Sequence, residues 1–213
     1  MANVDSPAGF RPVRHRNGAT YNGAAEPMYI ASTYETALFV GDPVVKVAAG
    51  SNTGAVKVPS VGNFPPGTLP AIERAAVTDG TFCSGVIIGF AANPSNLEQK
   101  HNPADNERVA LVCTDPDIVY EVQADGDLTE TMIGLNALHI NTNAGSTVTG
   151  RSGAELDTGT GTAPGADASY MWRIVGMVNR EDNDTTAANQ KALVVINMHS
   201  DLSTGDGDGA LGI

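Results

Sequence analysis

The sequence predicts an all-β protein, a β-barrel or β-sandwich with an extended N-terminal arm and long loops. The 213 residues include 24 Gly and 12 Pro, which recur at short intervals, as expected where turns join many strands. Short apolar runs rich in β-branched residues lie between these turns, and such residues suit a pleated surface. In residues 118–124 apolar and polar side chains alternate, which is typical of a half-buried strand.

Residues 1–27 are predicted to form the arm. Their prolines and glycines oppose a stable helix, and no apolar period develops. Apolar residues are interleaved with three arginines in this segment. An arm of this kind can pack along a neighbouring molecule and bind its carboxylates, although a solvated terminus explains the same residues. The candidate partner contacts are Phe10, Arg11, Pro12, Arg14 and Arg16.

Residues 28–200 are predicted to form a β-rich body. The clearest strand pair is 108–114 with 118–124, because Asp115, Pro116 and Asp117 between them suit a tight turn. The last two strands are expected to close the fold around a polar loop. In chain order, strands are expected at residues 28–32, 37–40, 44–49, 55–58, 71–77, 83–92, 108–114, 118–124, 170–179 and 191–198.

Three long segments without strand character are predicted as loops. Residues 59–70 are dense in proline and glycine, which indicates a stiff, irregular loop. Residues 93–107 are polar and indicate a surface excursion. Residues 141–168 are mostly Gly, Ser, Thr and Ala, which predicts a long exposed loop. An inserted subdomain within 59–107 is a further expectation.

One helical turn and an acidic tail complete the predicted body. Asp127 as N-cap with Glu130 three residues later predicts a helical turn. Residues 135–140 fit either the end of that helix or another strand. Residues 201–213 are predicted to be a flexible acidic tail.

The charge of the chain argues against nucleic acid as a partner. The formal net charge is -12, and a phosphate backbone is repelled by most of such a surface. No run approaches the ~20 apolar residues that span a membrane, and the N-terminus lacks the apolar stretch of a signal peptide. We therefore expect a protein made in a cytosol, with no membrane partner. In that compartment Cys83 and Cys113 are expected to be reduced and buried, the alternative being a disulfide.

No constellation for catalysis or metal binding is visible in the sequence. The histidines His15, His101, His139 and His199 are far apart and share no ligand spacing. No nucleophile elbow, phosphate-binding loop or dinucleotide fingerprint is present. The acidic residues near the C-terminus complete no calcium loop. The prediction is a protein that is not an enzyme and has no cofactor and no metal.

Four segments carry a resemblance to a known family. They are Asp5-Ser6-Pro7-Ala8-Gly9-Phe10-Arg11-Pro12-Val13-Arg14, Ala37-Leu38-Phe39-Val40-Gly41-Asp42-Pro43-Val44, Arg173-Ile174-Val175-Gly176-Met177-Val178-Asn179-Arg180 and Val194-Val195-Ile196-Asn197. In sequence and order they resemble the decoration, cement or stabilisation proteins of tailed-phage capsids. The resemblance implies a β-barrel or β-sandwich protein on a shell of HK97-fold capsid subunits, with no enzymatic residues to carry over.

The resemblance leads to a functional expectation. The protein would be a structural virion component made in the host cytoplasm, which binds the outer capsid surface and cements neighbouring capsomers. Its partners would be the major capsid protein and further copies of itself, as a trimer or alternatively a dimer. The alternatives are a tail-tube or other minor virion subunit, and a host-binding or carbohydrate-binding module with Phe64, Tyr170 and Trp172 as contacts.

Overall fold

A computed structural model describes residues 3–58, 61–159 and 161–202 of the chain. It confirms the all-β prediction. The strands are β1 (Arg11–His15), β2 (Glu26–Ile30), β3 (Pro43–Ser51), β4 (Val56–Val58), β5 (Gly62–Phe64), β6 (Pro70–Arg74), β7 (Gly85–Phe90), β8 (Arg108–Cys113), β9 (Ile118–Gln123), β10 (Asn136–Ala137), β11 (His139–Asn143), β12 (Gly153–Leu156), β13 (Trp172–Met177) and β14 (Lys191–Ile196).

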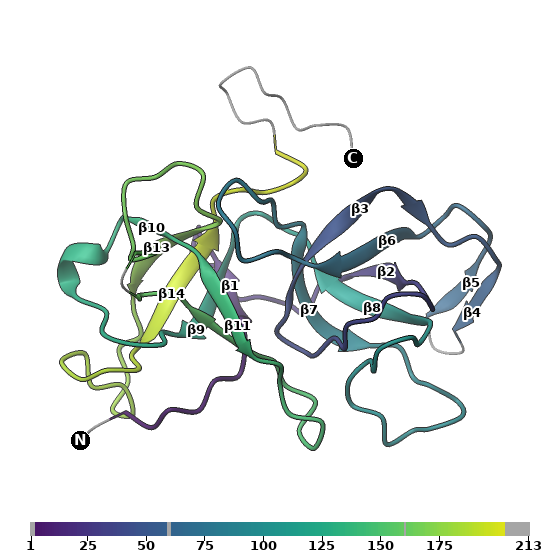
Figure 1. The fold of residues 1–213 in the computed structure, drawn as a ribbon, viewed down its shortest axis with the longest axis horizontal. Coiled ribbons are helices and arrows are strands. Elements are labelled where there is room, and N and C mark those ends of the chain that lie inside the picture. Colours follow the sequence, from purple (N-terminus) through teal and green to yellow (C-terminus); the bar gives the residue numbers. More distant parts are fainter. Residues whose placement is uncertain (1–2, 59–60, 160, 203–213) are drawn as a thin grey trace.

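The strands form two lobes that lie side by side (Figure 1). One lobe is a closed barrel with the order β2-β6-β3-β7-β8, and the short hairpin β4-β5 extends from it. The other lobe contains a five-stranded sheet with the order β1-β9-β14-β13-β10, together with the pair β11-β12. The barrel strands therefore all lie within residues 26–113, whereas the sheet lobe combines β1 with strands that follow residue 117.

Alternation of side chains along the strands explains how the barrel is filled. Met28 and Ile30 of β2 point into an interior cluster with Ile87, while Tyr29 between them points outward. The outward cluster that contains Tyr29 is covered in turn by Phe64 of the β4-β5 hairpin. The hairpin thus shields an apolar outer face of the barrel. Its first strand, β4, confirms the strand expected at 55–58, whereas its second strand, β5, forms within residues 59–70, which were predicted as an irregular loop.

The predicted pairing of 108–114 with 118–124 is wrong. Both strands form, but β8 belongs to the barrel, where it pairs with β2 and β7, and β9 belongs to the sheet, where it lies between β1 and β14. The turn at Asp115 closes as expected, with the Ile118 amide donating to the Asp115 carbonyl. This turn connects the barrel lobe to the sheet lobe. The pairing was mispredicted because a local turn signal does not specify whether the two strands that it joins lie next to each other.

The predicted helical turn is reduced to a single 3₁₀ turn, η1 (Glu130–Met132), with Thr129 rather than Asp127 as its N-cap. The backbone of Leu128 explains the difference. Its amide donates to Gln190 Oε1 at 2.8 Å, and its carbonyl accepts from Gln190 Nε2 at 2.9 Å. These bonds hold the chain extended at the position where a helix would begin.

Residues 141–168 are not one exposed loop. They contain the end of β11 and all of β12, whose four residues are buried. Gly153 explains the close packing, because a Cβ there would lie 2.5 Å from the Asn143 carbonyl oxygen of the paired strand. Residues 37–40, expected as a strand, make only isolated bridges at Leu38 and Val40. The predicted acidic tail lies outside the described residues except for Asp201 and Leu202.

Among the described residues no helix is long and apolar enough to span a membrane.

Both cysteines are buried and free, which confirms the predicted burial. Burial raises the pKa of Cys83 to about 12, and it also raises the pKa of Cys113. We therefore expect a thiol reagent to modify neither residue in the native protein at neutral pH, and to modify both after unfolding. Mass spectrometry after a short reaction provides the measurement. Rapid native modification of Cys83 would contradict the packing described here.

Candidate interaction surface

The N-terminal segment, where sequence analysis placed the partner contacts, is part of the folded body. Phe10 is 1% exposed and stacks on Trp172 with ring centroids 4.0 Å apart. It also meets His139 edge-on at 6.0 Å. The prediction that Phe10 contacts a partner is therefore wrong. The apolar side chain that would be costly to leave in water is covered by the protein's own second half.

Two glycines allow the backbone to pack closely beside Phe10. The Phe10 amide donates to the Gly41 carbonyl at 2.9 Å. Gly9 has φ +70°, and a Cβ there would lie 2.7 Å from the same carbonyl oxygen and 2.6 Å from Ser152 Cβ. The chain can pass this point only because neither Gly9 nor Gly41 carries a side chain.

The arginines of the predicted site lie on the surface beside β1, but two of them already have acidic partners. Arg11 Nη2 is 3.1 Å from Glu121 Oε2, and Arg16 Nη1 is 3.9 Å from Asp117 Oδ1. Both arginine side chains are 57% exposed. Arg14 is half-buried, and its Nη1 donates to the His15 carbonyl at 3.3 Å. These side chains remain accessible, and their contact with a partner remains a prediction.

Backbone edges are poor docking sites on this sheet. Pro12 of the outer strand β1 has no N–H, a bulge follows it, and Thr20 bridges Arg14 from outside. At the opposite edge, Asn136 of β10 exchanges both backbone bonds with Gly165. The two edges of this five-stranded sheet thus give no reason for self-association, and a contact between copies on this sheet would use side chains and loops.

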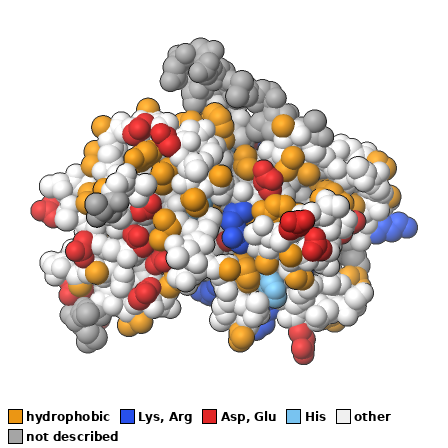
Figure 2. All heavy atoms as spheres, in the orientation of Figure 1, with side chains coloured by type: hydrophobic (Ala, Val, Ile, Leu, Met, Phe, Trp, Pro, Cys, Tyr) orange, Lys and Arg blue, Asp and Glu red, His pale blue; other side chains and the backbone are white. Residues whose placement is uncertain are grey.

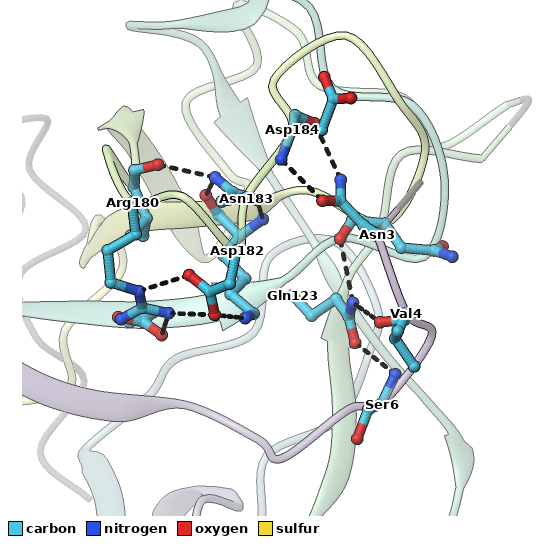
Figure 3. A network of polar contacts seen from close by, with 12 residues as sticks. Asn3, Val4, Ser6, Gln123, Arg180, Asp182, Asn183 and Asp184 are labelled. Carbon is cyan, nitrogen blue, oxygen red and sulfur yellow. Dashed lines mark hydrogen bonds and ion pairs between the residues drawn. The ribbon is translucent and has the colours of Figure 1, made fainter. Parts of the chain in front are cut away.

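Residues 3–8, here called the strap, precede Phe10 and cross the sheet lobe as extended chain (Figure 3). The Asn3 side chain donates to the carbonyls of Asp184 and Ala188, each at 2.9 Å, and accepts from the Asp184 amide at 2.7 Å. The buried Gln123 amide accepts from Ser6 N at 2.9 Å and donates to the Val4 carbonyl at 2.8 Å. The sequence does not predict this network, because isolated amide side chains form no recognisable sequence pattern.

The strap forms one wall of a groove of about 840 Å³. Its other walls are Gly41, Ile87 and Ile88, strand β9, and the segment around Arg180. Acidic side chains are spread over both lobes on the face shown in Figure 2, as the net charge of -12 requires.

A chain of ion pairs lines this groove. Glu121 accepts from Arg11 and, in a two-pronged contact at 2.9 and 3.0 Å, from Arg180. Asp182 in turn accepts from Arg180 Nε at 2.8 Å and from Lys191 Nζ at 2.6 Å. The hydrogen bonds that Arg180 donates to Asp182 and Glu121 raise the pKa of Arg180, and those that Asp182 accepts from Arg180 and Lys191 lower the pKa of Asp182.

We expect Glu121→Gln to lower the free energy of unfolding by about 0.5–1 kcal/mol, because two guanidinium groups lose their shared carboxylate at a partly exposed site. The loss should shrink when the salt concentration is raised, since added ions screen the pairs that remain in the parent protein. Urea unfolding at low and high NaCl measures both effects. Glu130→Gln, at an exposed glutamate without such a network, serves as the control. An effect of Glu121→Gln that does not depend on salt would contradict the electrostatic explanation.

The described residues contain no group of three or more His, Cys, Asp or Glu side chains arranged to hold a metal ion. The histidines have separate structural surroundings. Burial lowers the pKa of His139 to about 4, so this ring is neutral at physiological pH. His101 stacks on Phe39, and His199 Nε2 lies 2.9 Å from the Thr114 carbonyl oxygen.

Comparison of the chain with protein-family models, with curated protein sequences and with solved structures found no significant match.

Proposed function

We propose that this chain is a structural virion protein that binds the outer surface of an HK97-fold phage capsid and cements neighbouring capsomers. It acts by contact and has no catalytic role. Its partners are the major capsid protein and further copies of itself, as a trimer or alternatively a dimer.

The observation that carries the proposal is that the four segments on which the family resemblance rests contact one another in the folded chain. Gly9 packs on Gly41, which joins the first segment to the second. Arg11 and Arg180 share Glu121, which joins the first segment to the end of the third. The third and fourth segments pair as β13 and β14. Motifs spread over most of the chain thus form one structural unit, which supports treating them as a single signature.

The surface supports a protein that acts through contact. Arg11 and Arg14 of β1 and Arg16 just after it remain accessible, Arg11 and Arg16 beside their own acidic partners, on a molecule with a net charge of -12. This arrangement suits an orientation with β1 toward the shell and acidic loops toward solvent. The carbohydrate-binding alternative loses one of its three candidate contacts, because Trp172 is 0% exposed.

The test is binding of the purified protein to undecorated capsid shells, read as copies per shell by electron cryomicroscopy. The proposal expects a copy number comparable with the number of capsid subunits at saturation. Changing Arg11, Arg14 and Arg16 together to Ala should weaken binding roughly three- to tenfold, and less so at high salt. The matched control changes Lys57, Lys100 and Arg173 to Ala, which removes equal charge from exposed positions elsewhere.

Two outcomes would contradict the proposal. Failure of the full-length protein to bind any shell would remove the capsid function. Equal weakening by both triple variants would show that only net charge matters and that the β1 side is not the contact surface.

A further inference from the structure

The groove bordered by the strap lies where the two lobes meet. Ile87 and Ile88 of β7 line it from the barrel lobe, and strands β1 and β9 line it from the sheet lobe. Its volume of about 840 Å³ falls within the range of roughly 300–1,000 Å³ that is usual for ligand sites, which are frequent where two domains meet. The size and place of the groove therefore suit a binding site.

Positive charge is concentrated in this groove on an acidic molecule. Among the described residues, four of the chain's 12 Lys and Arg residues line the groove, against three of its 24 Asp and Glu residues. The formal charge of the lining is therefore +1, whereas that of the whole chain is -12. The basic residues are Arg11, Arg151, Arg180 and Lys191, and the acidic residues are Glu121, Glu181 and Asp182. A carboxylate ligand thus meets a more favourable charge here than on the molecule as a whole.

The carboxylate that two of these arginines share is covered, while the arginines remain accessible. Glu121 is 13% exposed, but the side chains of Arg11 and Arg180 are 57% and 40% exposed. Arg11 donates to Glu121 through Nη2, and no residue in the described part of the chain accepts from its Nε or Nη1. A guanidinium group carries five N–H donors in a planar fork, so Arg11 can bind a second carboxylate without losing the first.

Arg151 is the basic residue of the groove for which the described ranges contain no acidic partner. Its side chain is exposed, whereas its backbone is held in place. The Arg151 carbonyl accepts from the Ser146 amide at 2.9 Å, and on either side of it Val40 exchanges backbone bonds with Gly150 and Ser152 at 2.9 and 2.8 Å. The guanidinium group is therefore carried by a fixed backbone, and binding a carboxylate there breaks no existing ion pair.

The groove also has an apolar lining. Its half-buried apolar residues are Ala8, Pro12, Val40 and Ile88. Main-chain hydrogen bonds are less available, because Pro12 has no N–H and the Ser6 amide and Val4 carbonyl of the strap already bind Gln123. A ligand that fits this lining presents carboxylates together with small apolar groups and is recognised through its side chains.

We propose that the groove binds an extended segment of a partner protein that carries carboxylate and small apolar side chains. Arg11 and Arg151 bind the carboxylates, and Val40 and Ile88 contact the apolar side chains. A nucleic acid fits less well, because three carboxylates line the same groove and the surrounding molecule is acidic. This assignment goes beyond the capsid function and does not depend on it, because the segment can be supplied as a free peptide.

The experiment selects peptides from a displayed library on the immobilised full chain. About eight randomised residues suffice, since an extended peptide of that length spans roughly 26 Å. We expect Asp and Glu to be enriched at least about threefold over the input library, and the best peptide to bind more weakly at high salt. Arg11→Gln together with Arg151→Gln should weaken that peptide roughly three- to tenfold. The matched control, Lys57→Gln with Lys100→Gln, removes equal charge from exposed positions outside the groove and should bind as the parent does.

NMR of the ¹⁵N-labelled protein locates the bound peptide. Amide shifts should change at Gly41 and Ile88 on one side of the groove and at Arg11 and Lys191 on the other. A selection without acidic enrichment, equal weakening by the two double variants, or shift changes confined to residues outside the groove would each overturn the proposal.

A second copy of the chain as the occupant is a separate outcome. It would be seen in analytical ultracentrifugation as a concentration-dependent dimer that the Arg11→Gln, Arg151→Gln variant weakens, and this result would overturn the assignment to a partner protein. Because the peptide measurements contain no shells, a failure of capsid binding leaves them unchanged, and the two proposals can fail separately.

Discussion

Replacing Phe10 by Ala is expected to lower the free energy of unfolding by about 3–5 kcal/mol. The side chain is 1% exposed and lies against the faces and edges of two other buried rings, so its removal leaves a cavity that these rings cannot fill. Phe10→Leu should have a smaller effect, because it keeps part of the volume.

Urea unfolding followed by the fluorescence of Trp172, the one Trp in the sequence, measures this change directly at the site. Val4→Ala is the control, since Val4 is an apolar residue of the same N-terminal segment but is 77% exposed, and its stability should stay close to that of the parent. If the Phe10→Ala protein were as stable as the parent, the burial of Phe10 against Trp172 would be contradicted, and Phe10 would again be a candidate partner contact. For the same reason, deleting residues 1–16 should prevent stable folding rather than leave a soluble body without its arm.

Asp42→Ala is expected to destabilise the protein by a similar amount, about 3–5 kcal/mol. Asp42 is 1% exposed; its Oδ2 accepts from the Phe39 amide at 2.8 Å and lies 3.1 Å from Arg74 Nη2, and its Oδ1 accepts from Ser152 Oγ at 2.5 Å. Burial raises the pKa of Asp42, and the Arg74 guanidinium opposes that rise. Removing the carboxylate leaves Arg74 without its acidic partner. It also leaves the Phe39 amide and the Ser152 hydroxyl without their acceptor, at the point where the barrel lobe meets Ser152, the residue before β12.

The control for Asp42→Ala is an exposed ion pair. Asp117 and Arg16 are 70% and 57% exposed and 3.9 Å apart, so Asp117→Ala should cost less than about 0.5 kcal/mol. The double variant Asp42→Ala with Arg74→Met should recover part of the loss, because it no longer buries a lone charge. Additive effects of the two changes would show that the Asp42–Arg74 pair contributes little.

The sequence by itself determined the fold class and the place of most strands. Period-two alternation and β-branched runs are local properties, and they located β2, β3, β4, β6, β7, β8, β9, β13 and β14 to within a few residues. The burial of Cys83 and Cys113 followed from their apolar neighbours in the same way. The two closing strands were likewise expected on either side of a polar loop, and the structure pairs them as β13 and β14.

Only the tertiary structure decided which distant segments meet. A phenylalanine among arginines on a proline-rich segment has the same sequence pattern whether it anchors to a partner or to its own chain. Phe10 is buried because Trp172, 162 residues later, supplies a matching face. The same holds for Gln123, whose side chain binds Val4 and Ser6 of the strap, more than one hundred positions away in the sequence. Local propensity carries no information about such pairs, because their energies depend on distances that exist only after the chain has folded.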